Sequence, residues 1–109
     1  MKNIFEVVDP RGYKIVCSED SLNNHIIPHH PMMKGQEEEI KATIENPELG
    51  LIYQDANRPE RNIYYKLRKK RDSYLKVVVE FDNNNDGTVI TAFPVSYPKS
   101  GEKIIWSKN

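Results

Sequence analysis

Apolar and polar positions follow a strand-like pattern at the start of the chain. Two short apolar runs, residues 4–8 and 13–17, flank a polar segment at residues 9–12. In that segment Pro10 fixes φ and Gly12 supplies a positive φ, which together are typical of a tight turn. The first 17 residues are therefore predicted to form a β-hairpin.

A helical pattern follows at residues 18–27. Leu22, His25 and Ile26 stand at positions i, i+3 and i+4, so they are expected to share one helix face. Pro28 is expected to end this helix, because the residue before a proline avoids the α region. Three side chains are candidates for capping its start: Ser18, Asp20 and Ser21.

Residues 36–46 are predicted to form a second helix. Glutamates at positions 37–39 fall in its first turn, where the helix dipole favours negative charge. Ile40 and Ile44 lie one turn apart, which gives the helix an apolar stripe. Pro47 is expected to end it.

Beyond residue 48 the apolar period becomes two, which predicts strands. These strands are expected at residues 49–53, 62–68, 74–81, 88–95 and 103–106, with a hairpin loop at residues 83–87. Helices and strands are thus segregated, which indicates a single α+β domain over residues 1–109. The predicted architecture is an N-terminal hairpin and two short helices packed on a four- to five-stranded antiparallel sheet.

Strand alternation also sorts side chains by face. In residues 62–68, Ile63, Tyr65 and Leu67 fall on one face, and the other face holds Tyr64, Lys66 and Arg68. In the same way Thr91 is grouped with Val89 and Phe93, and Lys76 with Tyr74 and Val78. Whether Thr91 and Lys76 share a face depends on strand register, because a slip of one residue exchanges the faces.

Composition narrows the class of protein. The chain has 38% hydrophobic residues and equal numbers of basic and acidic ones, 16 of each. This balance argues against a strongly basic nucleic-acid wrapper and against an acidic tail protein. No run resembles a signal peptide or a membrane span. Cys17 is the single cysteine, so no disulfide can form within the chain, and a reducing, cytoplasmic location is expected.

Charge is nevertheless uneven along the chain. Basic residues gather between positions 58 and 76, and tyrosines lie among them: Arg58, Arg61, Tyr64, Tyr65, Lys66, Arg68, Lys69, Lys70, Arg71, Tyr74 and Lys76. Cations beside aromatic rings suit the phosphates and bases of RNA, so one basic surface is a candidate binding site. The alternative is a solvated hairpin tip at residues 66–72, whose charges only protect a sheet edge.

Three histidines, His25, His29 and His30, lie within six positions. Imidazole is the side chain best suited to proton transfer near pH 7, and His25 is the leading candidate. The alternative is that His25 packs or caps the helix. A metal site at His25 and His29 is disfavoured, because Pro28 lies between them and no carboxylate or thiol completes the set, so neither a metal nor a cofactor is expected. Thr91 offers a hydroxyl to a phosphate, or is simply a strand former.

An ordered series of short segments resembles a known nuclease family. The segments are Asn24-His25-Ile26-Ile27, His30-Pro31, Ile40 to Pro47 with Thr43 and Ile44, Tyr64-Tyr65, Leu75 to Val79, Gly87 to Phe93, and Gly101 to Trp106. Together with the leading strand-turn-strand, this order resembles the phage-type branch of the barnase–EndoU–colicin–RelE (BECR) fold.

The resemblance implies a metal-independent endoribonuclease that leaves a 2′,3′-cyclic phosphate, often a toxin or a phage- or plasmid-borne effector. It implies an RNA substrate and a cognate antitoxin or immunity protein as partners. By position it assigns catalytic roles to His25, Lys76, Thr91 and Tyr65, and substrate contacts to Arg61, Lys66, Arg68, Tyr64 and His30.

Two further readings stay open. One is a non-catalytic RNA- or protein-binding module of the same fold, in which the histidine, threonine and cation would be scattered rather than line one cleft. The other is a structural component that binds a partner through an exposed apolar patch at residues 104–106.

Overall fold

The computed structural model describes residues 2–68, 73–99 and 101–108. The strands are β1 (Asn3–Val8), β2 (Lys14–Ser18), β3 (Leu51–Gln54), β4 (Arg61–Arg68), β5 (Ser73–Phe81), β6 (Gly87–Val95) and β7 (Lys103–Ser107). The helical segments are η1 (Ser21–Ile26), α1 (Ile27–His29), η2 (Pro31–Met33), α2 (Glu37–Glu45) and η3 (Glu48–Gly50). The predicted α+β class and the N-terminal hairpin are confirmed.

The sheet is larger than predicted and is not purely antiparallel. Among the described residues its seven strands run in the order β1-β2-β6-β5-β4-β3-β7. The hairpin joins the sheet because β2 pairs in parallel with β6, through Ile15–Gly87 and Val16–Thr88. A Cβ atom on Gly87 would lie 2.7 Å from Val79 and 2.9 Å from Ile15, so glycine is what allows this approach.

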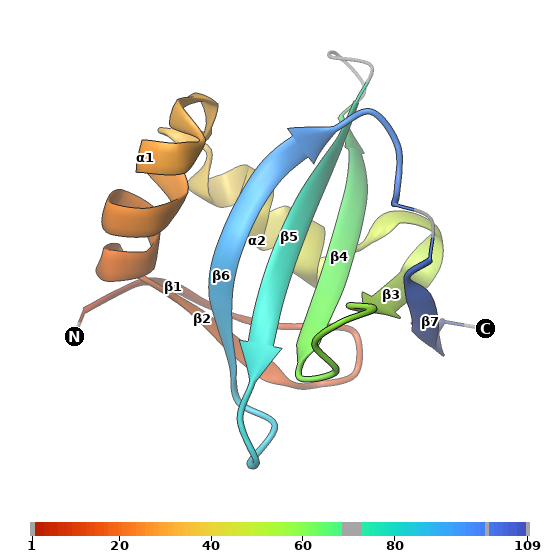
Figure 1. The fold of residues 1–109 in the computed structure, drawn as a ribbon. Helices are drawn as coiled ribbons and strands as arrows, with labels where there is room; N and C mark the ends of the chain where they lie inside the picture. Colours follow the sequence, from red (N-terminus) through yellow and green to blue (C-terminus); the bar gives the residue numbers. More distant parts are fainter. Residues whose placement is uncertain (1, 69–72, 100, 109) are drawn as a thin grey trace.

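The helix α2 covers one face of the central strands and leaves the other free of it. In Figure 1, α2 lies behind β4, β5 and β6, and α1 stands at the side of β6. The main core lies on the α2 side and includes Ile40, Ile44 and Tyr64, all fully buried. A smaller cluster of Ile63, Tyr65 and Val78 lies on the opposite side. We call that opposite side of β4, β5 and β6 the open face.

The second helix follows the sequence prediction closely. Glutamates 37–39 occupy the first turn of α2, and the buried residues of the helix include Ile40 and Ile44. Burying one such isoleucine contributes about 1.5–3 kcal/mol, so this stripe fixes how α2 docks.

The first helix, made of η1 and α1, begins as predicted but differs from its prediction further along. Ser18 caps its start, since the Ser18 Oγ accepts the backbone N–H of Ser21 at 3.0 Å. However, the Ile27 N–H bonds to the carbonyl of Leu22, five residues back, so the turn is a wide π turn. Leu22 and Ile26 are buried but His25 is exposed, because three residues no longer return to the same face of a wider turn.

The prediction that Pro28 ends this helix is also wrong. The helix runs on to His29, and the His30 N–H bonds to the carbonyl of Ile26 at 2.8 Å. Pro28 stands in the first turn of α1, directly after the π turn ends. Proline is tolerated in a first turn because the N–H that it lacks would have no partner within the helix there.

A buried polar cluster ties the turn of the hairpin to β4. The Asp9 carboxylate accepts hydrogen bonds from Arg11 Nε at 2.9 Å and Nη2 at 2.8 Å, and from the Tyr64 hydroxyl at 2.7 Å. Arg11 Nη2 also donates to Asn62 Oδ1 at 2.8 Å. The guanidinium lies over the ring of Tyr13, 4.6 Å from its centre. One carboxylate thus joins the turn between β1 and β2 to the inner strand β4.

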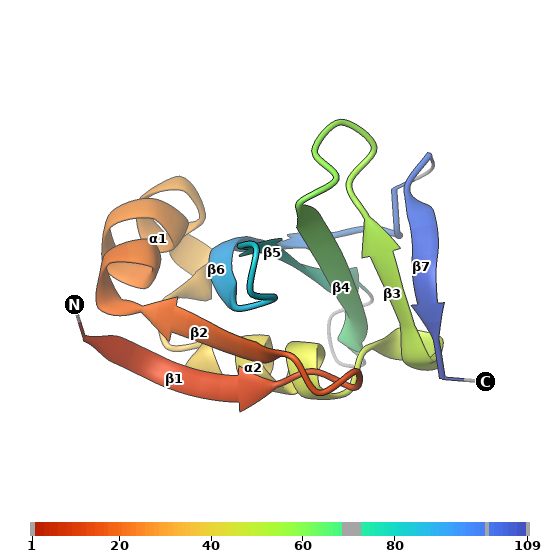
Figure 2. The same ribbon diagram turned by 90° about the horizontal axis from the view of Figure 1, so that it is seen from below.

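The C-terminal strand β7 lies at the edge of the sheet, beside β3 (Figure 2). Ile104 and Ile105 are exposed there, while Trp106 packs partly against the main core. Within the described residues, no helix has the length and apolar character needed to span a bilayer.

Replacing Asp9 should destabilise the protein strongly. Asp9→Asn removes the charge that Arg11 faces and leaves a guanidinium that is only slightly exposed without its counter-ion. We expect the free energy of unfolding to fall by about 3–5 kcal/mol in urea titration. Glu6→Gln removes a carboxylate from the exposed Glu6–Lys14 pair and should change stability by no more than about 1 kcal/mol. Equal losses in the two variants would contradict this assignment.

The Cys17 thiol should be unreactive in the folded protein. Burial, and after it the charge of Glu37, raises its pKa to about 11. Because the thiolate is the reacting species, we expect slow reaction with a disulfide reagent at pH 8 and fast reaction in denaturant. Comparable rates in the two conditions would show that Cys17 is accessible.

Candidate functional site

Strand register brings the two central candidates onto one face. Lys76 pairs across the sheet with Tyr65 on one side and with Phe93 on the other. Val78, two residues from Lys76, pairs with Thr91. Since alternate residues of a strand share a face, Lys76, Tyr65 and Thr91 all lie on the open face.

A bulge in β6 sets this arrangement. The pairing shifts between Val78 and Val79, so that Val79 faces Val89 and Ile90 is the additional residue. Val89 therefore points into the main core, whereas Thr91 does not. The predicted grouping of Thr91 with Val89 is wrong, because a bulge interrupts the alternation on which it was based.

A pocket lies between the first helix and β6. Its volume is about 550 Å³, and it is lined by Asp20, Ser21, His25, His29, His30, Ile90 and Thr91. Thus all three histidines and the candidate hydroxyl surround one space. The bulge contributes directly, since Ile90 and Thr91 both line the pocket.

Asp20 orients His25 at the mouth of this pocket. Its Oδ2 lies 3.3 Å from Nε2 of His25, and its Oδ1 accepts a hydrogen bond from Asn24 Nδ2 at 2.8 Å. The bond from Asn24, with a smaller effect of His25, lowers the pKa of Asp20. The carboxylate is therefore ionised at neutral pH, and the His25 side chain, 61% exposed, lies beside a fixed negative charge.

His30 lies deeper and is held by an aromatic partner. Its ring stacks on Phe93 with the centres 4.7 Å apart and the planes 19° from parallel. Burial, and then the charge of His29, lowers the pKa of His30 below 6.5. Its imidazole is therefore mostly uncharged at pH 7 and able to accept a proton.

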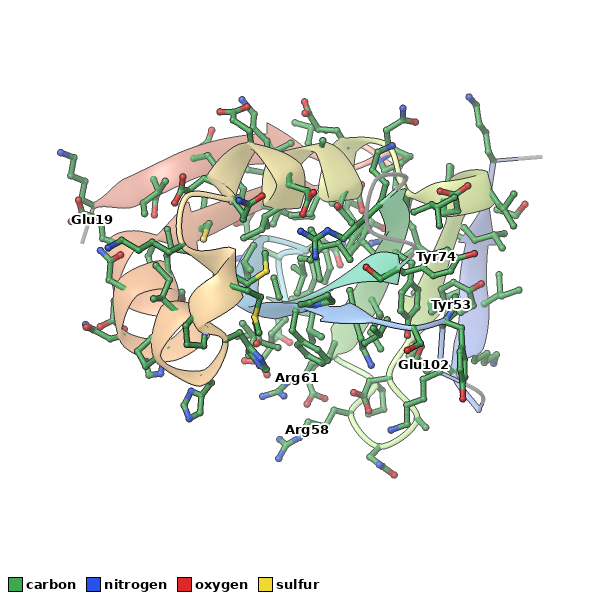
Figure 3. All side chains as sticks on the ribbon, turned by 90° about the horizontal axis from the view of Figure 1, so that it is seen from above. Glu19, Tyr53, Arg58, Arg61, Tyr74 and Glu102 are labelled. Carbon is green, nitrogen blue, oxygen red and sulfur yellow. The ribbon has the colours of Figure 1, made fainter. Side chains whose placement is uncertain are left out.

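A second polar group on the open face centres on Glu102. Lys76 Nζ donates to Glu102 Oε2 at 3.0 Å, and the Tyr65 hydroxyl donates to Glu102 Oε1. The backbone N–H of Lys99 donates to the same hydroxyl at 3.2 Å. Burial is the main cause that raises the pKa of Tyr65, so the phenol stays protonated. Figure 3 shows Glu102 on the same side of the molecule as Tyr53 and Tyr74.

The remaining predicted contacts do not form one basic surface in the described part of the chain. Arg61 is on the open face and pairs with Glu80 at 3.1 Å. Three others lie on the α2 side of β4: Tyr64 is in the core, Lys66 Nζ donates to the carbonyl of Asn46, and Arg68 pairs with Glu39. The alternation of β4 separates these residues, and the acidic first turn of α2 meets Arg68. Lys69, Lys70 and Arg71 lie outside the described residues.

Sequence reasoning missed three residues of the site. Phe93 follows Thr91 by two positions, so alternation already placed it on the same face. Asp20 was considered only as a helix cap. Glu102 follows Gly101 in an irregular segment, and no periodicity marks it. Within the described residues, no three His, Cys, Asp or Glu side chains are grouped so as to hold a metal ion.

Comparisons with family models, with curated proteins and with solved structures find no match to this chain.

The pKa of His30 offers a direct check on the pocket. Titration followed by NMR should give His30 a pKa below 6.5. Phe93→Ala uncovers the ring and should move that pKa upward, because desolvation is the larger cause. His29→Gln removes a neighbouring charge and should move it upward by less. A His30 pKa that both variants leave unchanged would contradict the described packing.

Proposed function

We propose that the protein is a metal-independent endoribonuclease whose reaction takes place in the pocket between the first helix and β6. The observation that carries this proposal is that His25, His30 and Thr91 line one pocket, with Lys76 and Tyr65 on the same sheet face. Cleavage of RNA by its own 2′-hydroxyl requires one proton acceptor, one proton donor and donors for the phosphate oxygens.

The two histidines divide the proton transfers. His30, mostly uncharged at neutral pH, accepts the proton of the 2′-hydroxyl as its oxygen bonds to phosphorus. His25 donates a proton to the 5′-oxygen as the bond between that oxygen and phosphorus breaks. The products are a 2′,3′-cyclic phosphate and a 5′-hydroxyl, and the ionised Asp20 holds the His25 ring in place.

Hydroxyl and ammonium groups support the phosphate. Thr91 lines the pocket and donates to a non-bridging oxygen. Lys76 Nζ lies 5.8 Å from the centre of the Phe93 ring, and His30 stacks on the same ring, so Phe93 is a neighbour of both Lys76 and His30. The Tyr65 phenol, kept protonated by burial, acts as a donor and not as a base.

A second candidate function is a non-catalytic module that binds RNA or a protein. One observation favours it: Lys76 and Arg61, two cations of the open face, each form an ion pair with a carboxylate. Paired cations stabilise developing negative charge less than free ones do.

If the protein is a ribonuclease, a cognate antitoxin or immunity protein would be the partner that covers the pocket.

His25→Ala should abolish most RNA cleavage. With EDTA present, we expect the wild type to cleave single-stranded RNA and leave cyclic-phosphate ends, and the variant to be about 10²–10⁴ times slower. Lys14→Ala, on an exposed side chain of β2, serves as the folded control and should cleave normally.

Two outcomes of this assay would contradict the proposal or its mechanism. Failure of the folded wild type to cleave any of several RNAs would overturn the ribonuclease and favour the binding module. Cleavage that His25→Ala retains would remove His25 from the mechanism.

A further inference from the structure

The carboxylate of Glu102 is bonded to groups of the kind that bind phosphate. Its side chain is 3% exposed, and that of Lys76 is 12% exposed. One oxygen accepts from the Lys76 ammonium and the other from the Tyr65 phenol. Ammonium and hydroxyl donors on a sheltered surface make an anion site, and here the anion belongs to the protein.

Groups other than Glu102 also contact these two donors. The Lys99 N–H occupies a lone pair of the Tyr65 oxygen, which directs the phenol proton away toward the carboxylate. Lys76 Nζ lies 5.9 Å from the centre of the Tyr65 ring and 5.8 Å from that of Phe93. Tyr65 lies on β4 and Phe93 on β6, so the rings beside the Lys76 ammonium come from the strands that flank β5.

Glu102 itself is supplied from outside the three central strands β4, β5 and β6. It lies between Gly101, with φ of 90°, and the edge strand β7. The side chains of β7 are mostly exposed, and within the described residues β3 is its only neighbouring strand. A Cβ at Gly101 would meet nothing within 4 Å, so the chain beside Glu102 borders open space.

We propose that Glu102 is an internal substitute for a phosphate of a polynucleotide backbone, and that it leaves Lys76 and Tyr65 when such a phosphate binds. This inference rests on the proposed function, because that function names the polynucleotide. The exchange replaces one buried anion by another, so the lysine is never left unpaired, a condition that is strongly unfavourable. Glu102 thereby restricts the site to ligands that compete with it.

The test removes the charge of Glu102 and keeps its size. Glu102→Gln is titrated with a fluorescein-labelled deoxyribonucleotide hexamer, which lacks the 2′-hydroxyl and is therefore not cleaved, and binding is followed by fluorescence anisotropy. We expect affinity to rise about tenfold over wild type at equal ionic strength. Adding Lys76→Met to this variant should remove the gain.

A matched control separates this effect from a change in net charge. Glu45→Gln alters the same charge on an exposed side chain of α2, which lies on the other side of the sheet. We expect it to change affinity by less than about twofold. A comparable rise in both variants would overturn the inference.

Other outcomes are also decisive. A folded Glu102→Gln that binds the hexamer no better than wild type overturns the proposal, and so does a gain seen with inorganic pyrophosphate but not with the hexamer. Should the variant fail to fold, NMR of the wild type decides instead: saturating hexamer should shift the amide signals of Gly101 and Glu102, and unchanged signals would overturn it. Because this probe needs no cleavage, the result is independent of the ribonuclease assay.

Discussion

The buried carboxylate of Asp9 is the constraint on which the arrangement of the two halves of the sheet depends. The parallel pairing between β2 and β6 consists of two residue pairs, so it is a short attachment of the hairpin to the rest of the sheet. Asp9 adds a second attachment, because Arg11 and Tyr64 both bond to it and Tyr64 comes from β4, three strands from β2 in the sheet order. With both attachments in place, α2 packs against β1 as well as β4 and β5. A buried charge held in this way is costly to leave unpaired, so the attachment is specific.

Covering one side of the sheet determines what the other side contains. The main core takes the side chains that point toward α2, and the open face keeps Lys76, Tyr65 and Thr91. The bulge at Ile90 lets β6 contribute to both the main core and the open face, since it directs Val89 into the core and Thr91 onto the open face. The π turn does the equivalent for the first helix: it buries Leu22 and Ile26 and directs His25 out. Two local departures from regular structure therefore build the pocket.

The π turn and the β6 bulge could not be predicted from the sequence. Periodicity found the strands, the hairpin turns and the apolar stripe of α2, because each depends on neighbours in the sequence. It could not find the π turn at His25 or the bulge at Ile90, since both arise from packing against other elements. Nor could it place Glu102, whose partners Lys76 and Tyr65 lie 26 and 37 residues away. Candidate residues were identified by chemical type, but their grouping needed the register.

The pairing of charges bears on how the open face would recognise an anion. The chain has no net charge, and Lys76 and Arg61 are each neutralised by a neighbouring carboxylate. Long-range attraction of a polyanion is then weak, because steering depends on the summed field of the protein. Under the proposed function, recognition would act at short range, through the shape of the pocket and the proposed exchange of anions at Lys76. On that proposal the surface would discriminate by geometry, favouring a defined nucleotide conformation over indiscriminate binding to nucleic acid.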